Sequence, residues 1–336
     1  MISRRSALAG AGAALFAAPA RALADVGQGA RRSYGPGHLV AVRGKHLYVE
    51  ISGPADAPAL VYIHGGPGTG SYDFGLYQKQ RLSRHLRLIQ FDQRGALRSD
   101  AVGDHESFTL GDLVEDTEAL RKALGIERWS FLCQSFGGLI AVRYALAYPD
   151  AVQKALFNNP TIDIGSSCHN QLLQLAGAYR KLGDRKKYGE VLAAYHGNVS
   201  GRDAWLTFSR LGRDLPFDAR MDSYVHNLPS GYFTRWMVRS GLGKAFWYKG
   251  SGPSQITLWN TPGIFDGLET RLHELRKPIL LMKGRYDFVT APDQVAAFAR
   301  QARTRIVIFE KSGHLPEAEE PDRFAEVVSD FVLATP

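Results

Sequence analysis

A serine in a tight turn between two apolar stretches constrains this chain more than any other feature. Residues 129–133 have the length and apolar character of a buried strand, and residues 139–148 carry apolar side chains at helical spacing. Between them, residues 134–138 read Q-S-F-G-G. A strand, a sharp turn and a helix in this order lift a serine hydroxyl clear of a sheet and aim the next backbone N–H at a reacting carbonyl. The stretch therefore predicts a nucleophile at Ser135, with the small Gly137 that so tight a turn requires.

Further apolar runs of strand length predict the core of the fold. They lie at residues 39–42, 46–51, 59–63, 86–91, 151–157, 278–284 and 304–309. The first two form a hairpin around Arg43-Gly44-Lys45, whereas most of the later runs are continuously apolar. Helical patterns separate the later runs, at residues 108–124 (opened by Thr109), 292–303 and 319–333. The predicted fold class is therefore α/β, a mostly parallel central sheet with helices on both faces.

Residues 160–265 interrupt this alternation. The segment is rich in Tyr, Trp, Arg and Gly, contains helical patches such as residues 171–182, and has no clear strand pattern. Regular α/β order resumes at residue 278. We therefore expect a core formed by residues 25–159 and 266–336, and a mainly helical cap at residues 160–265, where a lid over the core would lie.

The first 24 residues have the features of an export signal. Residues 3–6 read S-R-R-S, residues 7–18 are apolar and rich in alanine, and residues 22–24 supply an A-x-A cleavage site. The apolar run is too short to cross a bilayer. The pattern therefore predicts a twin-arginine-type signal peptide and no stable membrane span, with the mature protein in the periplasm or outside the cell.

Composition and residue spacing limit the kinds of molecule that this chain is expected to bind. The chain has 45% hydrophobic residues and a formal net charge of +8, but its basic residues are scattered. Nucleic-acid binding would need a concentrated basic stripe, so we expect a small molecule or short peptide as substrate. No spacing suits a metal site and no glycine-rich loop suits a dinucleotide, so no metal or cofactor is expected. Cys133 and Cys168 are expected to be free thiols.

Three residue types in a fixed order indicate acyl transfer. A nucleophilic serine needs a base that takes its proton and an acid that orients the base. Asp287 ends G-R-Y-D just beyond a buried strand, where α/β folds place functional groups. His314, in S-G-H-L-P, follows the last predicted strand. Ser135, Asp287 and His314 are therefore the predicted catalytic triad.

Two motifs near the third and fourth strands are interpreted as support for that site. H-G-G-P-G at residues 64–68 stands where a second oxyanion donor belongs, and its glycines let a backbone N–H approach a substrate oxygen. His64 is expected to order this turn. D-Q-R-G at residues 92–95 is interpreted as structural, with a buried Asp92 and Arg94 tying loops near the turn.

Together these motifs resemble those of the α/β-hydrolases and, within that fold, the proline iminopeptidase group of serine peptidases. The similarity covers nearly all of residues 35–335, and Cys133 departs from it where the pattern usually has glycine. The resemblance implies a helical cap and oxyanion donors at the N–H groups of Gly66 and Phe136. It also implies release of an N-terminal residue, often proline, from a short peptide or amide.

One cap motif differs from the group. Members often carry G-P-S-E-F, whose Glu receives the substrate's free amino group, whereas residues 252–256 read G-P-S-Q-I. Gln255 is thus the expected substrate-binding residue, but it brings no charge, which should weaken amine recognition by about 1–3 kcal/mol. The acids of the inserted segment are few: Asp163, Asp184, Glu190, Asp203, Asp214, Asp218 and Asp222. Our hypothesis is that the substrate is an uncharged or N-blocked amide, an ester or a lactone.

Three classes of function remain open from the sequence. An exported amidase or peptidase of the iminopeptidase type comes first, and an exported esterase or lactonase on the same scaffold comes second. A non-catalytic binding protein comes third. The presence of Ser135, Asp287 and His314 together argues against it, because a protein that only binds a ligand does not need all three. Epoxide hydrolases and haloalkane dehalogenases need a carboxylate at the turn, so Ser135 excludes their chemistry. The oligomeric state is not predicted.

Overall fold

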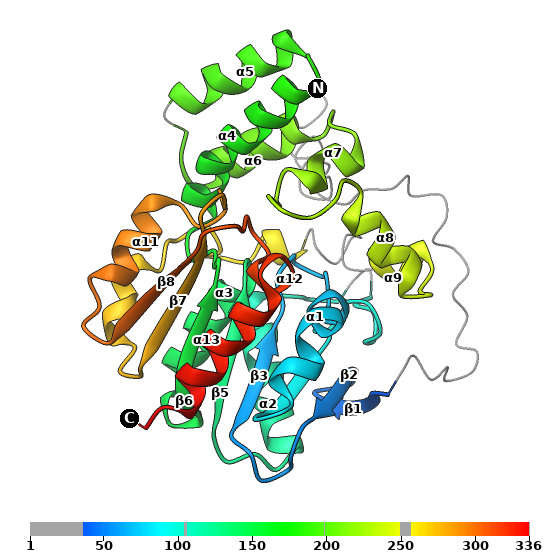
Figure 1. Ribbon diagram of the computed structural model, residues 1–336, viewed down its shortest axis with the longest axis vertical. Coiled ribbons are helices and arrows are strands. Elements are labelled where there is room, and N and C mark those ends of the chain that lie inside the picture. The colour runs from blue at the N-terminus through cyan, green and yellow to red at the C-terminus, as the bar shows by residue number, and fades with distance from the viewer. Residues whose placement is uncertain (1–35, 104–105, 198, 249–256, 336) are drawn as a thin grey trace.

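The computed structural model describes residues 36–103, 106–197, 199–248 and 257–335, so the predicted signal at residues 1–24 lies outside it. Strands form at β1 (His38–Val42), β2 (Lys45–Ser52), β3 (Ala59–Ile63), β4 (Arg87–Phe91), β5 (Trp129–Gln134), β6 (Val152–Asn158), β7 (Ile279–Gly284) and β8 (Thr304–Phe309). All eight lie within two residues of the predicted runs. They form one sheet in the order β1-β2-β4-β3-β5-β6-β7-β8, antiparallel only at the pairs β1–β2 and β2–β4 (Figure 1). The predicted α/β fold class is confirmed.

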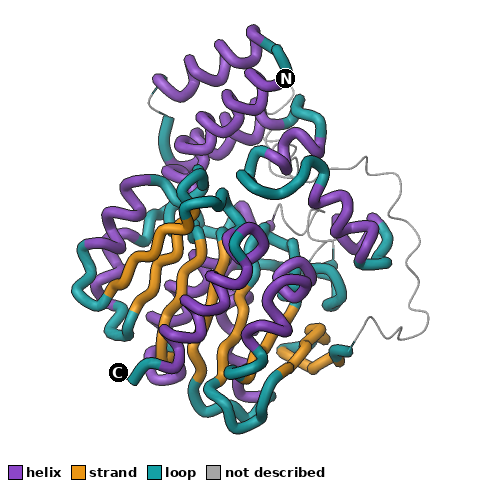
Figure 2. Tube along the Cα trace, in the orientation of Figure 1, coloured by secondary structure: helices purple, strands orange, loops and turns teal. Residues whose placement is uncertain are grey.

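Helices cover both faces of this sheet (Figure 2). One face packs on α2 (Leu110–Ala123), α3 (Gly137–Ala147) and α11 (Pro292–Ala299), and the other on α1 (Tyr72–Leu82) and α13 (Pro321–Leu333). Successive strand residues point to opposite faces: Val61 and Ile63 join the first apolar cluster, and Leu60 and Tyr62 join the second. Continuous apolar runs are therefore what a sheet buried on both sides requires.

Local sequence explains where the helices begin and end. Thr109 caps α2, since its Oγ1 accepts the N–H of Asp112 at 3.2 Å while the Asp112 carboxylate accepts the N–H of Thr109 at 3.0 Å. The predicted C-terminal helix at residues 319–333 forms as α13. It begins at Pro321, which has no N–H to donate to a preceding turn, so the short α12 (Pro316–Glu319) before it is a separate helix. Helix α1 has no counterpart among the predicted elements.

The chain between β6 and β7 is helical where the structure describes it. Its helices are α4 (Ile164–Lys181), α5 (Arg185–His196), α6 (Gly201–Gly212), α7 (Phe217–Asp222), α8 (Tyr232–Arg239) and α9 (Lys244–Tyr248). Figure 1 shows α4 to α7 above the sheet and α8 and α9 beside them. Within the described residues, no helix has the length and apolar character that crossing a bilayer requires.

Candidate active site

The turn after β5 holds Ser135 in a strained backbone conformation. Its φ angle is +54°, in the left-handed region that residues with a Cβ seldom adopt. The Ser135 N–H donates to the Asn158 carbonyl at 3.2 Å, and its carbonyl accepts the N–H of Thr161 at 2.8 Å. A Cβ at Gly137 would lie 2.4 Å from the Ile63 carbonyl oxygen, so only glycine fits there. These contacts raise Ser135 out of the sheet at the start of α3.

Asp287 and His314 come together across two loops. The Asp287 Oδ1 and His314 Nδ1 atoms are 2.8 Å apart, and both residues are buried. The hydrogen bond to Asp287 holds the proton on Nδ1 and leaves Nε2 as the nitrogen that can accept a proton. His314 lines the same pocket as Ser135. The structure thus brings all three predicted triad residues to one site.

Backbone groups and a lysine surround the Asp287 carboxylate. Oδ1 also accepts the N–H of Val289 at 2.9 Å, and Oδ2 accepts the N–H of Thr290 at 3.0 Å. Lys283 Nζ lies 3.0 Å from Oδ2 and donates to the carbonyls of Gly284 and Asp287. Burial alone would raise the pKa of Asp287, but the Lys283 ammonium and His314 outweigh it and hold that pKa below its ordinary range. The carboxylate therefore stays ionised at neutral pH.

Replacement of Lys283 by methionine is expected to destabilise the fold by about 3 kcal/mol, because it leaves a buried carboxylate without its ammonium partner. A carboxylate with a depressed pKa stabilises the fold above its ordinary pKa and loses that contribution as the pH falls through its folded value. Without Lys283 the folded pKa of Asp287 rises, so acid unfolding should begin at a higher pH. Thermal melting between pH 3 and 7 measures both effects, with the exposed Lys311→Met as the control. Equal shifts in the two variants would contradict the prediction.

Polar side chains position the loop that carries His314. Asn159 Nδ2 donates to the Gly313 carbonyl at 3.1 Å, and Asn159 Oδ1 accepts the N–H of Gly284 at 2.9 Å. Glu319 accepts the N–H groups of Gly313 at 2.8 Å and of His226, in the loop after α7, at 2.7 Å. A Cβ at Gly284 would lie 1.8 Å from the Gly313 carbonyl oxygen. The two loops can approach this closely only because position 284 has no side chain.

The glycine-rich turn after β3 lies beside Ser135. Gly66 and Phe136, the expected oxyanion donors, both line the pocket. Phe136 stands at the N-terminus of α3, where backbone N–H groups have no acceptor within the helix. His64 Nδ1 lies 2.9 Å from the Gly65 carbonyl, and its Nε2 accepts the N–H of Gln93 at 2.9 Å. With both ring nitrogens engaged by backbone groups, His64 orders the turn.

The D-Q-R-G motif is structural, as the sequence suggested, but its two charges pair separately. Asp92 accepts the N–H of Ser71 at 2.8 Å and the Arg98 Nε at 2.7 Å, whereas Arg94 pairs with Asp116. Burial alone would raise the pKa of Asp92, but Arg98 outweighs it and holds that pKa below its ordinary value. Asp92 thus fixes the loop after β4 to Ser71, just before α1, and Arg94 fixes the same loop to α2.

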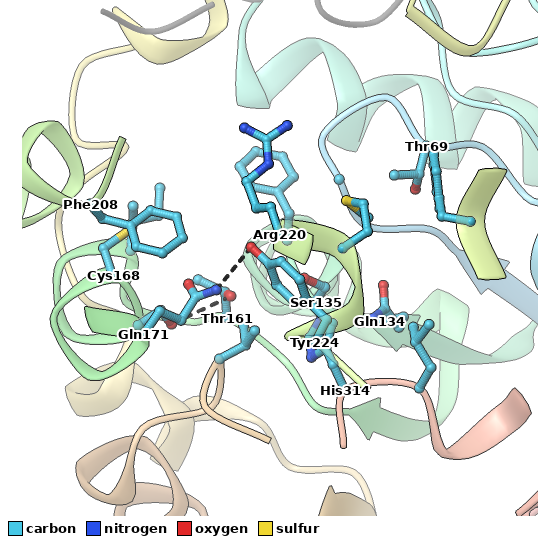
Figure 3. Close-up of a pocket in the computed structure, with 18 of the residues that line it drawn as sticks. Thr69, Gln134, Ser135, Thr161, Cys168, Gln171, Phe208, Arg220, Tyr224 and His314 are labelled. Carbon is cyan, nitrogen blue, oxygen red and sulfur yellow. Dashed lines mark hydrogen bonds between the residues drawn. The ribbon is translucent and has the colours of Figure 1, made fainter. Parts of the chain in front are cut away.

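Aromatic side chains, most of them from the chain between β6 and β7, form a large part of the pocket wall, beside polar and charged residues that include Arg220 and Asp73. The aromatic lining comprises Phe136, Trp205, Phe208, Tyr224, Tyr232, Phe233, Trp236 and Trp259. Figure 3 shows Tyr224 beside Ser135 and His314. Gln171 Nε2 donates to the Tyr224 hydroxyl at 3.1 Å. Burial raises the pKa of Tyr224 to about 12, so its hydroxyl remains a neutral hydrogen-bonding group. Gln255, the expected substrate-binding residue, lies outside the described residues.

Sequence reasoning missed several residues that the structure places at this site. Lys283 directly precedes the G-R-Y-D motif, and nothing in its sequence context indicates that it pairs with Asp287. Tyr224 and Asp73 line the pocket but come from segments with no distinct pattern. Cys133 and Cys168 are both buried and unpaired, as predicted. Burial raises the pKa of both thiols, so neither is a reactive thiolate at neutral pH.

Comparison with known proteins agrees with this geometry. A family model described as alpha/beta hydrolase fold matches residues 58–321, which is most of the chain. The chain belongs to the alpha/beta hydrolase fold family. The matched region begins just before β3 and ends at the start of α13, and it includes the turn of Ser135, the Asp287–His314 pair and the helices between β6 and β7.

Individual proteins similar to this chain include peptidases and a lactonase. A proline iminopeptidase from Heyndrickxia coagulans is 24% identical over 302 residues, covering 89% of this chain and 99% of that protein. The solved structure of a proline iminopeptidase-related protein from Thermus thermophilus matches 88% of this chain and 97% of its own, with a TM-score of 0.69 at 24% identity. The enol-lactonase from Burkholderia xenovorans matches 88% of this chain and all of its own, with a TM-score of 0.62 at 21% identity. At these identities the two structures establish a shared fold.

Proposed function

We propose that this alpha/beta hydrolase is a serine hydrolase that cleaves a small amide, or releases an N-terminal residue, through an acyl-enzyme. The observation that carries the proposal is the 2.8 Å contact between Asp287 and His314 at the pocket that Ser135 also lines. A buried carboxylate, an oriented imidazole and a raised serine are the three parts that such chemistry needs.

Each step follows from these positions. Ser135 Oγ attacks the scissile carbonyl carbon and gives its proton to His314 Nε2. The backbone N–H groups of Gly66 and Phe136 stabilise the oxyanion, which then collapses as the bond to the leaving group breaks. His314 donates its proton to that leaving group. A water molecule, activated by the same imidazole, then hydrolyses the acyl-enzyme and restores the Ser135 hydroxyl.

An ester or lactone is the second candidate substrate. The triad does not separate the two classes, because amides and esters pass through the same acyl-enzyme. The wide aromatic lining of the pocket favours an apolar acyl or alcohol group as readily as a prolyl residue.

A matched set of substrates tests the proposal: a prolyl arylamide with a free amine, the same compound N-acetylated, and a short-chain aryl ester. Ser135→Ala serves as the blank for each. Hydrolysis of an amide at rates that the blank does not reach supports the first candidate, and hydrolysis of the ester alone supports the second. If the wild type hydrolyses none of them and a fluorophosphonate serine probe labels neither protein, the proposed function is wrong.

We also propose that residues 1–24 direct export. The proposal rests on the twin arginine, the apolar run and the A-x-A site. Expression in a bacterium with a twin-arginine pathway, followed by fractionation and N-terminal sequencing, tests it. A periplasmic protein that begins at Asp25 supports export, and a cytoplasmic protein that retains Met1 overturns it.

A further inference from the structure

The hydroxyl group of Tyr224 carries a proton that no described residue accepts. Gln171 Nε2 donates to the Tyr224 oxygen at 3.1 Å, so an N–H already occupies the direction of Gln171 and the hydroxyl proton must point elsewhere. The hydroxyl of Tyr232, in the same pocket, differs because it donates to the Met221 carbonyl at 3.2 Å. The Tyr224 hydroxyl is therefore a hydrogen-bond donor that a molecule in the pocket can use.

Tyr224 also lies close to the predicted reacting groups. Its ring centre is 5.6 Å from that of His314, and both residues line the pocket with Ser135. Figure 3 shows the ring of Tyr224 beside these two residues and its hydroxyl directed away from them, toward Gln171. The hydroxyl is thus placed to contact a part of the substrate that is distant from the scissile bond.

Arg220 places a positive charge near this hydroxyl. Arg220 belongs to α7, shortly before Tyr224, and its buried side chain lines the same pocket. Burial raises the pKa of Tyr224 to about 12, whereas the charge of Arg220 opposes that rise. A guanidinium has several donors in one plane, so Arg220 can hold a carboxylate in addition to its contacts within the protein. A neutral donor beside a guanidinium favours an anionic acceptor over a neutral one.

The negative charge of Asp73 enters the pocket from a different element. Asp73 stands in the first turn of α1, shortly after Thr69, and Figure 3 shows Thr69 on the opposite side of Ser135 from Gln171. Burial raises the pKa of Asp73 to about 6, although backbone N–H groups and the charge of Arg98 oppose that rise. Asp73 thus has Arg98 as an opposing charge, whereas Gln171, Arg220 and Tyr224 contribute donors from α4, α7 and the loop after α7.

We propose that Tyr224 and Arg220 bind a carboxylate of the substrate, with the Tyr224 hydroxyl and the Arg220 guanidinium as the donors. The inference rests on the proposed hydrolase function and names its substrate class: an amide or ester that carries a carboxylate at a distance from the scissile bond. The aromatic side chains of the pocket would cover the apolar chain between the two groups. Recognition then depends on an acid and not on a free amine, unlike the class that the sequence resemblance implies.

Matched pairs of substrates test the proposal. Each pair contains an aryl monoester or monoarylamide of glutaric, adipic or pimelic acid and its neutral isostere, in which methyl groups replace the carboxylate oxygens. A further pair, a hydroxybenzoate ester and an isopropylphenol ester of one short acid, places the carboxylate on the leaving group. The measurement is the ratio of kcat/KM for the acid to that for its isostere, with Ser135→Ala as the blank. We expect at least one pair to give a ratio of about 10 to 100, the value of a charge-assisted contact.

Two variants show whether the preference arises at Tyr224 and Arg220. Tyr224→Phe removes the donor but keeps the ring beside His314, and Arg220→Met removes the charge. Each substitution should lower the ratio about 10-fold or more, whereas a purely structural role would change both members of a pair alike. Tyr188→Phe, in α5 and outside the pocket lining, is the matched control, and thermal melting verifies folding. A wild type with no preference for the acid in any pair, or a preference that both variants retain, overturns the proposal.

A binding measurement separates this inference from the proposed function. Calorimetry with the monoanilides of the same diacids, and with the anilides of their neutral isosteres, is carried out in the Ser135→Ala background, where turnover cannot interfere. We expect at least one acid to bind more tightly than its isostere, and to lose that advantage when Tyr224→Phe is added. If the wild type hydrolyses none of the substrates, the proposed function fails while this measurement still decides the inference. If no acid binds better than its isostere, Tyr224 and Arg220 do not form a carboxylate site, whether or not the protein is a hydrolase.

Discussion

Ser135→Ala is expected to lower kcat/KM by about 10⁴- to 10⁶-fold on every substrate that the wild type hydrolyses, because no other group can form the acyl-enzyme. The residual rate would come from the oxyanion donors and from substrate binding. The backbone contacts of the turn do not involve the hydroxyl, and alanine has the same Cβ at a φ angle of +54°. The folded structure and its melting temperature should therefore change little. Steady-state kinetics and thermal melting of the same preparations measure both parts of this prediction.

The control is Ser209→Ala, at another buried serine. Its Oγ, in α6, has no hydrogen-bond partner among the described residues, so its loss should leave both activity and melting temperature close to those of the wild type. A fluorophosphonate probe should label the wild type and Ser209→Ala but not Ser135→Ala. Labelling of Ser135→Ala at the wild-type rate would show that the nucleophile is elsewhere.

The parts of this protein that could be predicted are those that local rules determine. The turn around Ser135 was predictable because a sharp strand-to-helix connection tolerates only a small residue at position 137, and the sequence has glycine there. The start of α2 was predictable because Thr109 and Asp112 form a reciprocal cap. Asp287 and His314 could be expected to meet because each follows a strand whose carboxyl end lies at the same edge of a parallel sheet.

The parts that escaped prediction depend on contacts between segments far apart in the chain. Helix α1 has glycine and polar residues among its apolar positions, so its pattern is weak and Asp73 could not be placed in the pocket. Arg94 and Arg98 are both buried, and Arg94 pairs with Asp116 while Arg98 pairs with Asp92, because the course of the loop after β4 decides which carboxylate each arginine meets. Each of these contacts is fixed by tertiary packing, which periodicity does not record.

Asp287→Asn is expected to lower kcat by about 10³- to 10⁴-fold with little change in KM, because the variant should hold His314 in the wrong tautomer. An asparagine has one oxygen and one NH₂ group in place of the two carboxylate oxygens. Two donors, Lys283 and the Thr290 N–H, approach the Oδ2 position, whereas one backbone donor, the Val289 N–H, approaches Oδ1, and an ammonium has no lone pair to accept a hydrogen bond. The asparagine oxygen should therefore face Lys283, and its NH₂ group should face His314 Nδ1. That arrangement makes Nδ1 an acceptor and puts the proton on Nε2, where it can no longer take the proton of Ser135.

Lys283 is thus expected to set the orientation of the asparagine side chain, and the double variant Lys283→Met/Asp287→Asn tests that role. In Lys283→Met/Asp287→Asn the ammonium is absent, so the amide can place its oxygen toward His314 Nδ1 in part of the molecules. We therefore expect the double variant to recover activity relative to Asp287→Asn, even though Lys283→Met alone destabilises the protein. The exposed Asp150→Asn serves as the control for the single substitution, and thermal melting verifies that each variant is folded at the assay temperature. If the folded double variant is no more active than Asp287→Asn, the lysine does not set the orientation, and the Thr290 N–H alone is enough to hold the asparagine oxygen.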